Sequence, residues 1–308
     1  MISLFVRPLL AVAVFILGST LARAESLPAL VDAGWLKSKL GSDGLVVLDI
    51  QGEKEFQRFH VPGAVNGPYT LWRTEGSKTE LPSMLPPVER LESMIGALGI
   101  SNDSHVIIVS TGRGAGDLAA AARVFWTFKV LGHDAVGVLD GGLVAYAEAG
   151  GRLASGAGQP VAAEFTAEPR PQMVPTAESV RDALDAGTRF VDARSQGEFV
   201  GIYTGDDKER PGTIPGSRHL PHDWLSADGS GKLRTRGALS ELFAASGIDP
   251  SEPQIHFCHS GNRAALTWFA AYALFGNESA TLYDGSMMEW ARRGDLPVDA
   301  KIKLCDAC

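Results

Sequence analysis

One short stretch of the chain carries the residue types best suited to covalent chemistry. An apolar run over residues 254–257 ends on Cys258, and Gly261 and Arg263 follow before a second apolar run over residues 264–275. This pattern predicts a buried strand, a tight loop and a buried helix. The amides of such a loop and of the first helical turn have no intrahelical acceptor, so they favour negative charge at one spot. A cysteine held there is favoured as the thiolate, which is a nucleophile.

The spacing of the thiol and the guanidinium narrows the chemistry. Cys258 and Arg263 form a Cys-x4-Arg loop, one residue shorter than the Cys-x5-Arg loop with which protein tyrosine phosphatases wrap a phosphate. The shorter loop suits a smaller cargo than a phosphate and argues against a phosphatase or an arsenate reductase. Gly261 lets the backbone turn without a Cβ in the way. The alternative for Cys258 is a buried core cysteine that only happens to precede a helix.

The elements that would position this loop occur twice in the chain. Landmarks keep their order in both halves at a separation of roughly 150 residues, which indicates an internal repeat. Each half alternates short β-rich runs with helical patterns, which is typical of an α/β unit with a mostly parallel sheet. The clearest pairs are residues 45–49 with 189–194, 60–64 with 213–217, and 138–142 with 282–286.

Four motifs of the second half resemble those of the tandem rhodanese family, the thiosulfate and 3-mercaptopyruvate sulfurtransferases. They are Asp-Ala-Arg at 192–194 with Glu-Phe at 198–199, Ile-Pro-Gly-Ser at 214–217, the cysteine loop, and Tyr-Asp-Gly-Ser at 283–286 with Glu-Trp at 289–290. The resemblance covers residues 27–298 and implies an α/β fold of two tandem rhodanese-like domains, each a mostly parallel sheet flanked by helices. It also implies that the first half has lost its cysteine, and Ser110 stands there instead. The first half is then expected to supply a wall of the cleft.

The start of the chain predicts export. A basic residue, Arg7, an apolar run over residues 9–17 and an A-x-A sequence at 22–24 are typical of a signal peptide, which predicts a periplasmic location. An uncleaved anchor is the alternative, although the run is too short to span a bilayer comfortably. The predicted segments are a signal peptide (1–24), an N-terminal rhodanese-like domain lacking the catalytic cysteine (25–150), a linker (151–174), a C-terminal catalytic rhodanese domain (175–300) and a tail (301–308) with Cys-x-x-Cys.

Composition sets limits on the partners of the chain. The 308 residues are 45% hydrophobic and 21% charged, with a net charge of −8 and a pI of about 5.4. This balance argues against broad binding to nucleic acids or anionic membranes. The expected partners are a small anionic sulfur donor and a thiophilic acceptor, with a thiol protein as a further acceptor. No cofactor, no metal site and no stable membrane insertion after signal cleavage are expected.

The cysteine count points to the same nucleophile. Three cysteines are an odd number for an exported chain, so Cys258 stays a free thiol if Cys305 and Cys308 pair. An oxidising compartment selects against a spare thiol without a role, which supports a reactive Cys258. Cys305 and Cys308 have three interpretations: a disulfide or idle tail, a thiol relay that accepts sulfur from Cys258, or a metal site, which two cysteines alone support only weakly.

Two arginines outside the cysteine loop are candidates for donor binding. Arg194 follows a strand, where α/β sites form, and the resemblance implies that it holds the anionic group of the substrate. The alternative is a salt bridge from Arg194 to Asp192 or Glu198. Arg210 lies near the place where mercaptopyruvate-type members carry a second anion-binding arginine, although the histidine usual before Ile-Pro-Gly is Thr213 here.

The remaining candidates lie within the cysteine loop itself. Arg263 and the loop amides are expected to stabilise negative charge on the sulfur, although an arginine in a first helical turn can instead bind loop carbonyls or a carboxylate. His259 could titrate near neutral pH and assist an anion, or simply face solvent. The loop residues expected to bind substrate are His259, Ser260, Gly261, Asn262 and Arg263.

The function that these residues predict is sulfur transfer in two displacement steps. The Cys258 thiolate takes the outer sulfur of thiosulfate or the sulfur of 3-mercaptopyruvate as a persulfide, and an acceptor such as cyanide or a thiol removes it. The loop interior departs from both the thiosulfate-type and the mercaptopyruvate-type members, so the donor stays open. The alternative function is a non-catalytic persulfide carrier that delivers sulfur to a partner protein.

Overall fold

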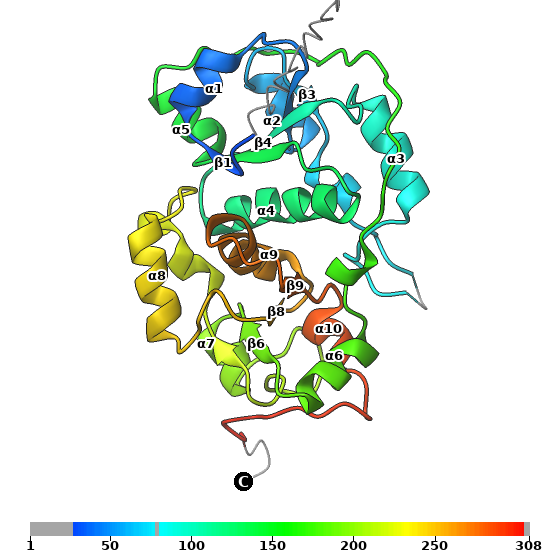
Figure 1. The fold of residues 1–308 in the computed structure, drawn as a ribbon, viewed down its shortest axis with the longest axis vertical. Coiled ribbons are helices and arrows are strands. Elements are labelled where there is room, and N and C mark those ends of the chain that lie inside the picture. Colours follow the sequence, from blue (N-terminus) through cyan, green and yellow to red (C-terminus); the bar gives the residue numbers. More distant parts are fainter. Residues whose placement is uncertain (1–26, 78–79, 305–308) are drawn as a thin grey trace, which may run out of the picture.

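The computed structural model describes residues 27–77 and 80–304. Figure 1 shows one sheet in each half of the chain, with helices around the sheets and helices from both halves at the interface between them. The strand pairings within both sheets are parallel, which confirms the predicted fold class. The predicted signal peptide (1–24) and the terminal cysteines, Cys305 and Cys308, lie outside the described residues.

The first half forms a five-stranded sheet in the order β1-β5-β4-β2-β3. Its strands are β1 (Leu30–Val31), β2 (Leu45–Asp49), β3 (Val65–Asn66), β4 (His105–Val109) and β5 (Val136–Leu139). Its helices are α1 (Ala33–Lys39), α2 (Glu53–Arg58), α3 (Val88–Ala97), α4 (Ala115–Val130) and α5 (Gly142–Glu148), with a 3-10 turn, η1 (Tyr69–Trp72). The central strand β4 is buried along most of its length, because helices cover both faces of a parallel sheet.

The second half repeats this plan with a four-stranded sheet in the order β7-β6-β8-β9. Its strands are β6 (Arg189–Asp192), β7 (Arg218–His219), β8 (Gln254–Phe257) and β9 (Ala280–Leu282). Its helices are α6 (Ala177–Asp185), α7 (Gln196–Val200), α8 (Arg236–Ala245), α9 (Asn262–Phe269) and α10 (Ser286–Trp290), with short turns η2 (Pro171–Met173), η3 (His222–Leu225) and η4 (Ala227–Gly229). The helix predicted over residues 264–275 is divided, because α9 continues into a π-helical turn, η5 (Ala270–Leu274).

The register of the second sheet brings two sequence motifs to one edge. Strands β6 and β8 pair in parallel with Asp192 opposite Phe257, so the residues that follow both strands leave the sheet at the same carboxyl edge. Ligand sites of open parallel sheets form at this edge. Arg194 and Cys258 therefore start from neighbouring strand ends, as their positions in the sequence predict.

The two halves share one hydrophobic core. Helix α4 of the first half packs along α9 of the second (Figure 1). At this contact the ring of Phe125 meets the ring of Phe269 edge to face, with centroids 4.9 Å apart, and lies 6.2 Å from that of Trp268. A single cluster of buried apolar side chains runs through the interface from one sheet to the other. The first half therefore lies directly behind the helix that follows the cysteine loop.

The predicted linker follows the surface of the first half. Ala154 forms a bridge with His60, and the Ala163 amide donates to the Gly96 carbonyl at 2.9 Å. Residues 151–170, all of which are described, contain no helix. The segment is therefore an ordered connection that is held by backbone hydrogen bonds.

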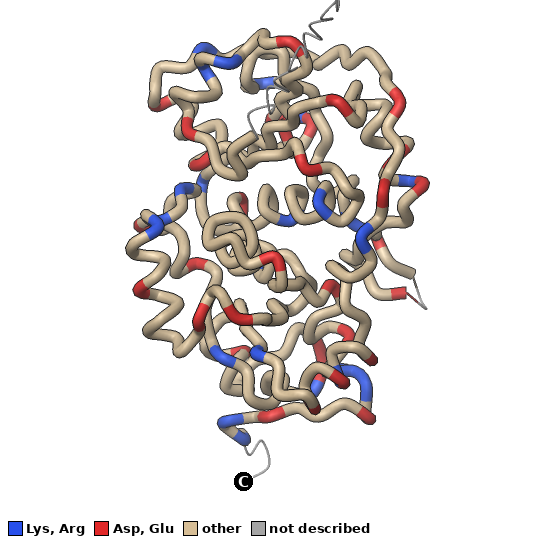
Figure 2. Tube along the Cα trace, viewed as in Figure 1, with Lys and Arg blue, Asp and Glu red and all other residues tan. Residues whose placement is uncertain are grey.

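The charged residues are dispersed over the molecule. Figure 2 shows basic and acidic residues interspersed along both halves. No helix within residues 27–77 and 80–304 is both long enough and apolar enough to cross a bilayer. An attraction for an anionic substrate must therefore come from a local arrangement of charges, because the net charge of the chain is −8.

Candidate active site

Cys258 lies at the carboxyl end of β8, in the turn that leads to α9, and is only 1% exposed. Gly261 makes this turn with a φ of +74°, a left-handed conformation that glycine adopts without strain. A Cβ at Gly261 would also meet Nη1 of Arg123 at 2.3 Å, so the loop lies directly against a side chain of the first half. The structure thus confirms the predicted strand, loop and helix around Cys258.

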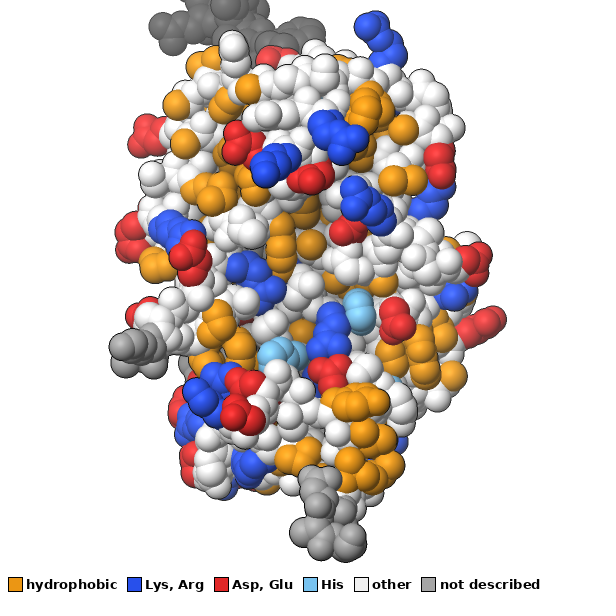
Figure 3. Space-filling view, turned by 180° about the vertical axis from the view of Figure 1, so that it is seen from behind, with side chains coloured by type: hydrophobic (Ala, Val, Ile, Leu, Met, Phe, Trp, Pro, Cys, Tyr) orange, Lys and Arg blue, Asp and Glu red, His pale blue; other side chains and the backbone are white. Residues whose placement is uncertain are grey.

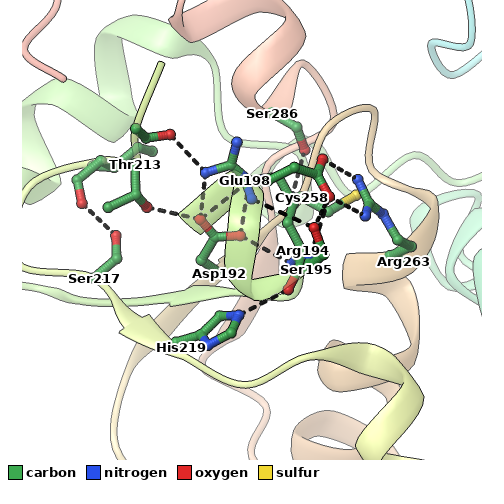
Figure 4. Close-up of polar contacts among 12 residues, drawn as sticks. Asp192, Arg194, Ser195, Glu198, Thr213, Ser217, His219, Cys258, Arg263 and Ser286 are labelled. Carbon is green, nitrogen blue, oxygen red and sulfur yellow. Dashed lines mark hydrogen bonds and ion pairs between the residues drawn. The ribbon is translucent and has the colours of Figure 1, made fainter. Parts of the chain in front are cut away.

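A hydroxyl from the turn after β9 holds the backbone of the cysteine loop. The amides of Cys258 and Gly261 both donate to Ser286 Oγ, each at 3.1 Å. The same hydroxyl donates to the Tyr283 carbonyl at 2.8 Å, and Figure 4 shows Ser286 beside Cys258. Two of the amides that the sequence predicts to converge on the sulfur are therefore bonded elsewhere.

Two further amides of the loop remain open to an anion. The structure records no acceptor, among the residues it describes, for the amides of His259 and Ser260. Both residues lie between Cys258 and the first turn of α9, whose own N-terminal amides lack intrahelical acceptors. This end of a helix favours negative charge. An anionic sulfur on Cys258 is therefore stabilised here.

Arg263 is held by a carboxylate. Its two terminal nitrogens donate to both carboxylate oxygens of Glu198, at 2.7 and 2.8 Å (Figure 4). Burial alone would raise the pKa of Glu198, but hydrogen bonds from Arg263 and Ser195 outweigh it and lower the pKa to about 2. The structure thus shows the carboxylate-bound interpretation of Arg263. The positive charge of Arg263 is therefore partly neutralised by Glu198 at the sulfur site.

Arg194 forms a buried ion pair with the aspartate two residues before it. Its Nη2 and Nε lie 2.6 and 3.0 Å from the carboxylate oxygens of Asp192 (Figure 4). Nη2 also donates to the Gly212 carbonyl at 2.8 Å, and the Thr213 hydroxyl adds a donor to Asp192 at 2.7 Å. Arg194 is 4% exposed, so the structure shows the salt-bridge alternative. Donor binding by Arg194 would require this pair to open.

Arg210 is fixed to the segment that follows α10. Its Nε donates to the Ala291 carbonyl at 3.1 Å, and its Nη2 donates to the carbonyls of Arg293 and Leu296 at 2.5 and 2.7 Å. These contacts differ from the anion-binding placement that the sequence suggested, because backbone carbonyls occupy Nε and Nη2 of the guanidinium. Arg210 instead anchors the irregular segment between α7 and β7.

His259 is covered by the same segment and does not simply face solvent. Its Nε2 lies 2.9 Å from Oε1 of Glu209, and that oxygen lies 3.6 Å from Nη2 of Arg292. The backbone of Gly205 lies against the ring, since a Cβ there would meet Nε2 at 1.9 Å. His259 therefore forms part of a charged network beside Cys258, which neither of its two interpretations predicted.

Two residues of the first half contact the cysteine loop directly, and the sequence did not single them out. Arg73 Nη2 donates to the Ser260 carbonyl, and the Tyr69 hydroxyl donates to Oδ1 of Asn262 at 2.6 Å. Ser260 and Asn262 were predicted to bind substrate; their contacts with the other half use the Ser260 carbonyl and the Asn262 side chain, and leave the Ser260 amide without a described acceptor. The local pattern around Tyr69 and Arg73 carries no signal for this contact.

A buried ion pair also joins the halves beside the loop. Arg123 of α4 lies 2.5 Å from Asp284 of the turn before α10, and the two side chains are 0% and 5% exposed. The other oxygen of Asp284 accepts the Leu85 amide at 2.7 Å. The sequence did hold a signal for this pair, because Arg123 is a lone charge in an otherwise apolar stretch of helix.

The first half has no thiol at the corresponding position. Ser110 follows β4 as Cys258 follows β8, and Gly142 occupies the place of Ser286. The backbone itself closes this loop, since a Cβ at Gly112 would meet the Gly141 carbonyl oxygen at 1.9 Å. The site that could perform covalent chemistry therefore lies in the second half.

Other groups bear on how an anion could approach. Figure 3 shows histidine, basic and acidic side chains next to one another near the middle of one face. The positive charges there are therefore partly offset by neighbouring carboxylates, as in the pair of Arg263 with Glu198. In the described parts of the chain, no group of three or more His, Cys, Asp or Glu side chains is placed to hold a metal ion.

The fold and the site define a two-domain α/β protein with one cysteine-loop site. The chain belongs to the rhodanese family, because the Rhodanese-like domain model matches residues 32–149 and again residues 176–293. One match falls in each half, and the second contains Cys258.

Similar proteins cover almost the whole chain. The 3-mercaptopyruvate sulfurtransferase of Homo sapiens is 34% identical over 275 residues, covering 88% of this chain and 87% of that protein. The thiosulfate sulfurtransferase of Mus musculus is 35% identical over 283 residues, covering 86% and 92%. The crystal structure of the 3-mercaptopyruvate sulfotransferase SseA from Escherichia coli matches with a TM-score of 0.73 and 28% identity, covering 84% of this chain and 98% of that one. Relatives named for both donors match to a similar extent.

Proposed function

We propose that this chain is a sulfurtransferase that moves sulfane sulfur from thiosulfate or 3-mercaptopyruvate to a thiophilic acceptor through a persulfide on Cys258. The observation that carries the proposal is the placement of Cys258, a thiol at the start of a helix beside two amides without described acceptors. The activities named for relatives that are 34% and 35% identical support the same reaction class.

The first displacement loads the enzyme. With thiosulfate as donor, the Cys258 thiolate attacks the outer sulfur, a new sulfur–sulfur bond forms to Cys258, and sulfite leaves with the electron pair of the broken bond. The open amides of His259 and Ser260 stabilise the anionic persulfide that results. Ser286 keeps the loop in this conformation through the amides of Cys258 and Gly261.

The second displacement unloads it. A thiophilic acceptor such as cyanide attacks the outer sulfur of the persulfide, thiocyanate leaves, and the Cys258 thiolate returns with the electron pair of the sulfur–sulfur bond. The same amides stabilise the thiolate that forms in this step. A cycle of two separate displacements has ping-pong kinetics.

The proposal extends to export and to the natural acceptor. The basic residue, apolar run and A-x-A sequence of residues 1–24 support secretion to the periplasm and cleavage before Glu25. A thiol protein of that compartment is then a candidate acceptor, because a thiolate attacks the outer sulfur of a persulfide as cyanide does.

Intact mass measured on the purified mature protein tests these statements together. We expect the mass of a chain that begins at Glu25. Treatment with thiosulfate or 3-mercaptopyruvate should add the mass of one sulfur atom. Cyanide should then remove that atom as thiocyanate. The Cys258→Ser variant should gain no sulfur. A wild-type protein that gains no sulfur from either donor contradicts the proposed function. Stable loading without catalytic release would instead indicate a sulfur carrier.

A further inference from the structure

Residues 69–74 and 83–85 of the first half run side by side toward the cysteine loop, and we call them the brace. The Thr74 amide donates to the Met84 carbonyl at 2.9 Å, and the Ser83 amide donates to the Thr74 carbonyl at 2.7 Å. Trp72 anchors the brace, since its side chain is fully buried and its Nε1 donates to the Gly67 carbonyl at 3.0 Å. The brace is therefore a rigid extension of the first half.

The brace grips the cysteine loop on both sides of its turn. Arg73 bonds the Ser260 carbonyl, and Tyr69 bonds the Asn262 side chain. These two loop residues flank Gly261, whose left-handed φ of +74° sets the turn. Arg73 Nη1 also donates to the Tyr69 hydroxyl at 2.9 Å, so the two brace side chains act as one unit.

The charge on Arg73 has no described counter-ion. Its guanidinium donates only to neutral oxygens: the carbonyls of Ser83 and Ser260 and the hydroxyl of Tyr69. No carboxylate in the described residues forms an ion pair with it, whereas Arg123 and Arg263 each have one. Arg73 is 9% exposed, and a buried charge without an opposite charge is costly.

The neighbouring tyrosine shows what Arg73 faces. Burial raises the pKa of Tyr69, the charges of Arg73 and Arg123 act to lower it, and the charge of Cys258 acts to raise it. Tyr69 therefore lies within electrostatic reach of both the guanidinium and the thiol. Arg73 is bonded to the Ser260 carbonyl, two residues after Cys258, so its charge lies beside the loop that carries the thiol.

We propose that Arg73 is a positioning residue of the sulfur-transfer site: it holds the cysteine loop through Ser260 and supplies the uncompensated positive charge that balances the anionic sulfur of Cys258. The inference rests on the proposed function, because it assigns Arg73 a part in forming and holding the Cys258 persulfide. The half of the chain without a thiol thereby contributes charge to the half that has one.

The rates of alkylation of Cys258 by iodoacetate and iodoacetamide separate charge from structure. The two reagents differ in charge, so the ratio of their rates reports the local field. We expect Arg73→Gln to lower the iodoacetate-to-iodoacetamide ratio about five- to tenfold. Arg73→Lys, which keeps the charge, should hold the ratio within about twofold of wild type. The matched control is Arg90→Gln, which removes an exposed charge from α3 and should change nothing.

Turnover measures the second part of the proposal. We expect kcat/KM for the loading donor to fall about 100-fold in Arg73→Gln, as when one donor is removed from an oxyanion site. Tyr69→Phe, which loses the contacts to Asn262 and to Arg73 Nη1 but keeps the charge of Arg73, should cost about tenfold with the alkylation ratio intact. Circular dichroism establishes that each variant is folded, and Arg73→Met, which also removes the charge, takes the place of Arg73→Gln if that variant does not fold.

Equal ratios in Arg73→Gln, Arg90→Gln and wild type would overturn the proposal. Equal loss of the ratio in Arg73→Gln and Arg73→Lys would overturn the role of charge. The alkylation ratio does not depend on sulfur transfer. A wild-type protein that forms no persulfide therefore contradicts the proposed function alone, while the ratio still decides the role of Arg73.

Discussion

Each half has an aspartate that accepts a backbone amide of the other half, but only one of the two aspartates is paired with an arginine. In the first half, Asp140 at the end of β5 accepts the Leu233 amide of the second half at 2.8 Å. In the second half, Asp284 after β9 accepts the Leu85 amide of the first half at 2.7 Å. Only the second contact is described with a buried arginine, Arg123, paired to the aspartate. The repeat thus keeps its backbone exchange, while the ion pair lies at the half that carries Cys258.

The turns that follow these two aspartates also differ between the halves. Ser286 and Gly142 share a left-handed backbone, with φ of 50° and 56°. Glycine adopts this conformation without strain, whereas serine is strained in it. The strain is maintained because the Ser286 hydroxyl holds two amides of the cysteine loop. In the first half no such hydroxyl fits, since a Cβ at Gly142 would meet the Ser110 carbonyl oxygen at 2.3 Å.

A third pair of positions shows how each half treats a buried carboxyl. Asp192 has Arg194 as its partner, whereas Asp49 has the neutral Gln51, whose amide and side chain donate at 2.9 Å. Burial raises the pKa of Asp49 to about 6, against the lowering effect of the Gln51 hydrogen bonds. In both of these aspartate pairs, the member in the second half has an arginine partner, whereas the member in the first half has none among the described residues.

The largest expected effect comes from breaking the ion pair between the halves. Arg123→Met leaves Asp284 as a buried charge without a partner, which should lower the free energy of unfolding by about 3–5 kcal/mol. Asp140→Asn, which alters the aspartate equivalent to Asp284 in the first half, should cost under about 1 kcal/mol, because Asp140 has no arginine partner among the described residues. Urea denaturation of the two variants measures the difference.

The double variant Arg123→Met/Asp284→Asn sharpens this test. It removes the uncompensated charge, so it should recover part of the stability that Arg123→Met loses. If Arg123→Met costs no more than Asp140→Asn, the ion pair does not distinguish the two halves energetically.

A smaller effect is expected from making the turn of the second half like that of the first. Ser286→Gly leaves the amides of Cys258 and Gly261 without their acceptor, so persulfide formation should slow about 10- to 100-fold. Its stability should stay close to wild type, because relief of the left-handed strain offsets the lost hydrogen bonds. Stopped-flow loading with thiosulfate and thermal unfolding give the two quantities.

Ser286→Ala is the control for that change. It loses the hydroxyl and keeps the strained backbone, so it should be slow to load and also less stable than Ser286→Gly by about 1 kcal/mol. Loading at the wild-type rate in both variants would show that the hydroxyl is dispensable for the loop.

The smallest expected effect concerns Asp49, the buried carboxyl of the first half, which has a neutral partner in Gln51. Because the pKa of Asp49 is raised from 3.8 to about 6 in the folded chain, its contribution to stability is fully present below pH 4 and is lost as pH rises through 6. Asp49→Asn cannot lose a proton, so it should be more stable than wild type at pH 7.5 by about 1 kcal/mol. Urea denaturation at pH 4.5 and 7.5 measures this, and an unchanged difference between the two pH values would refute it.

The sequence predicted local features of the site well and distant partners poorly. Cys258 and its loop could be located because the strand, the glycine turn and the helix are adjacent in the chain. The partner of Arg263 could not be located from the sequence, because Glu198 lies 65 residues away and binds the guanidinium only in the folded chain. The same holds for Arg73, which is separated from Ser260 by 187 residues.

The sequence also located two further arginines, Arg194 and Arg210, without indicating which groups they bind. Arg194 was placed correctly at a strand end, but its role depends on whether Asp192 or a substrate takes its donors. An intramolecular partner two residues away has the higher effective concentration, and the structure shows that pair. For Arg210, the competing acceptors are carbonyls more than 80 residues downstream, which no local pattern indicates.

The single hydrophobic core that joins α4 and α9 has a consequence for what would follow if one half of the chain were deleted. Two repeats visible in the sequence are one unit in folding, since neither half can bury its helix without the other. A deletion that removed the half without a thiol would expose that helix to water and leave the surviving half prone to aggregate. The first half, which has no thiol at the position equivalent to Cys258, therefore stabilises the half that has one by burying α9.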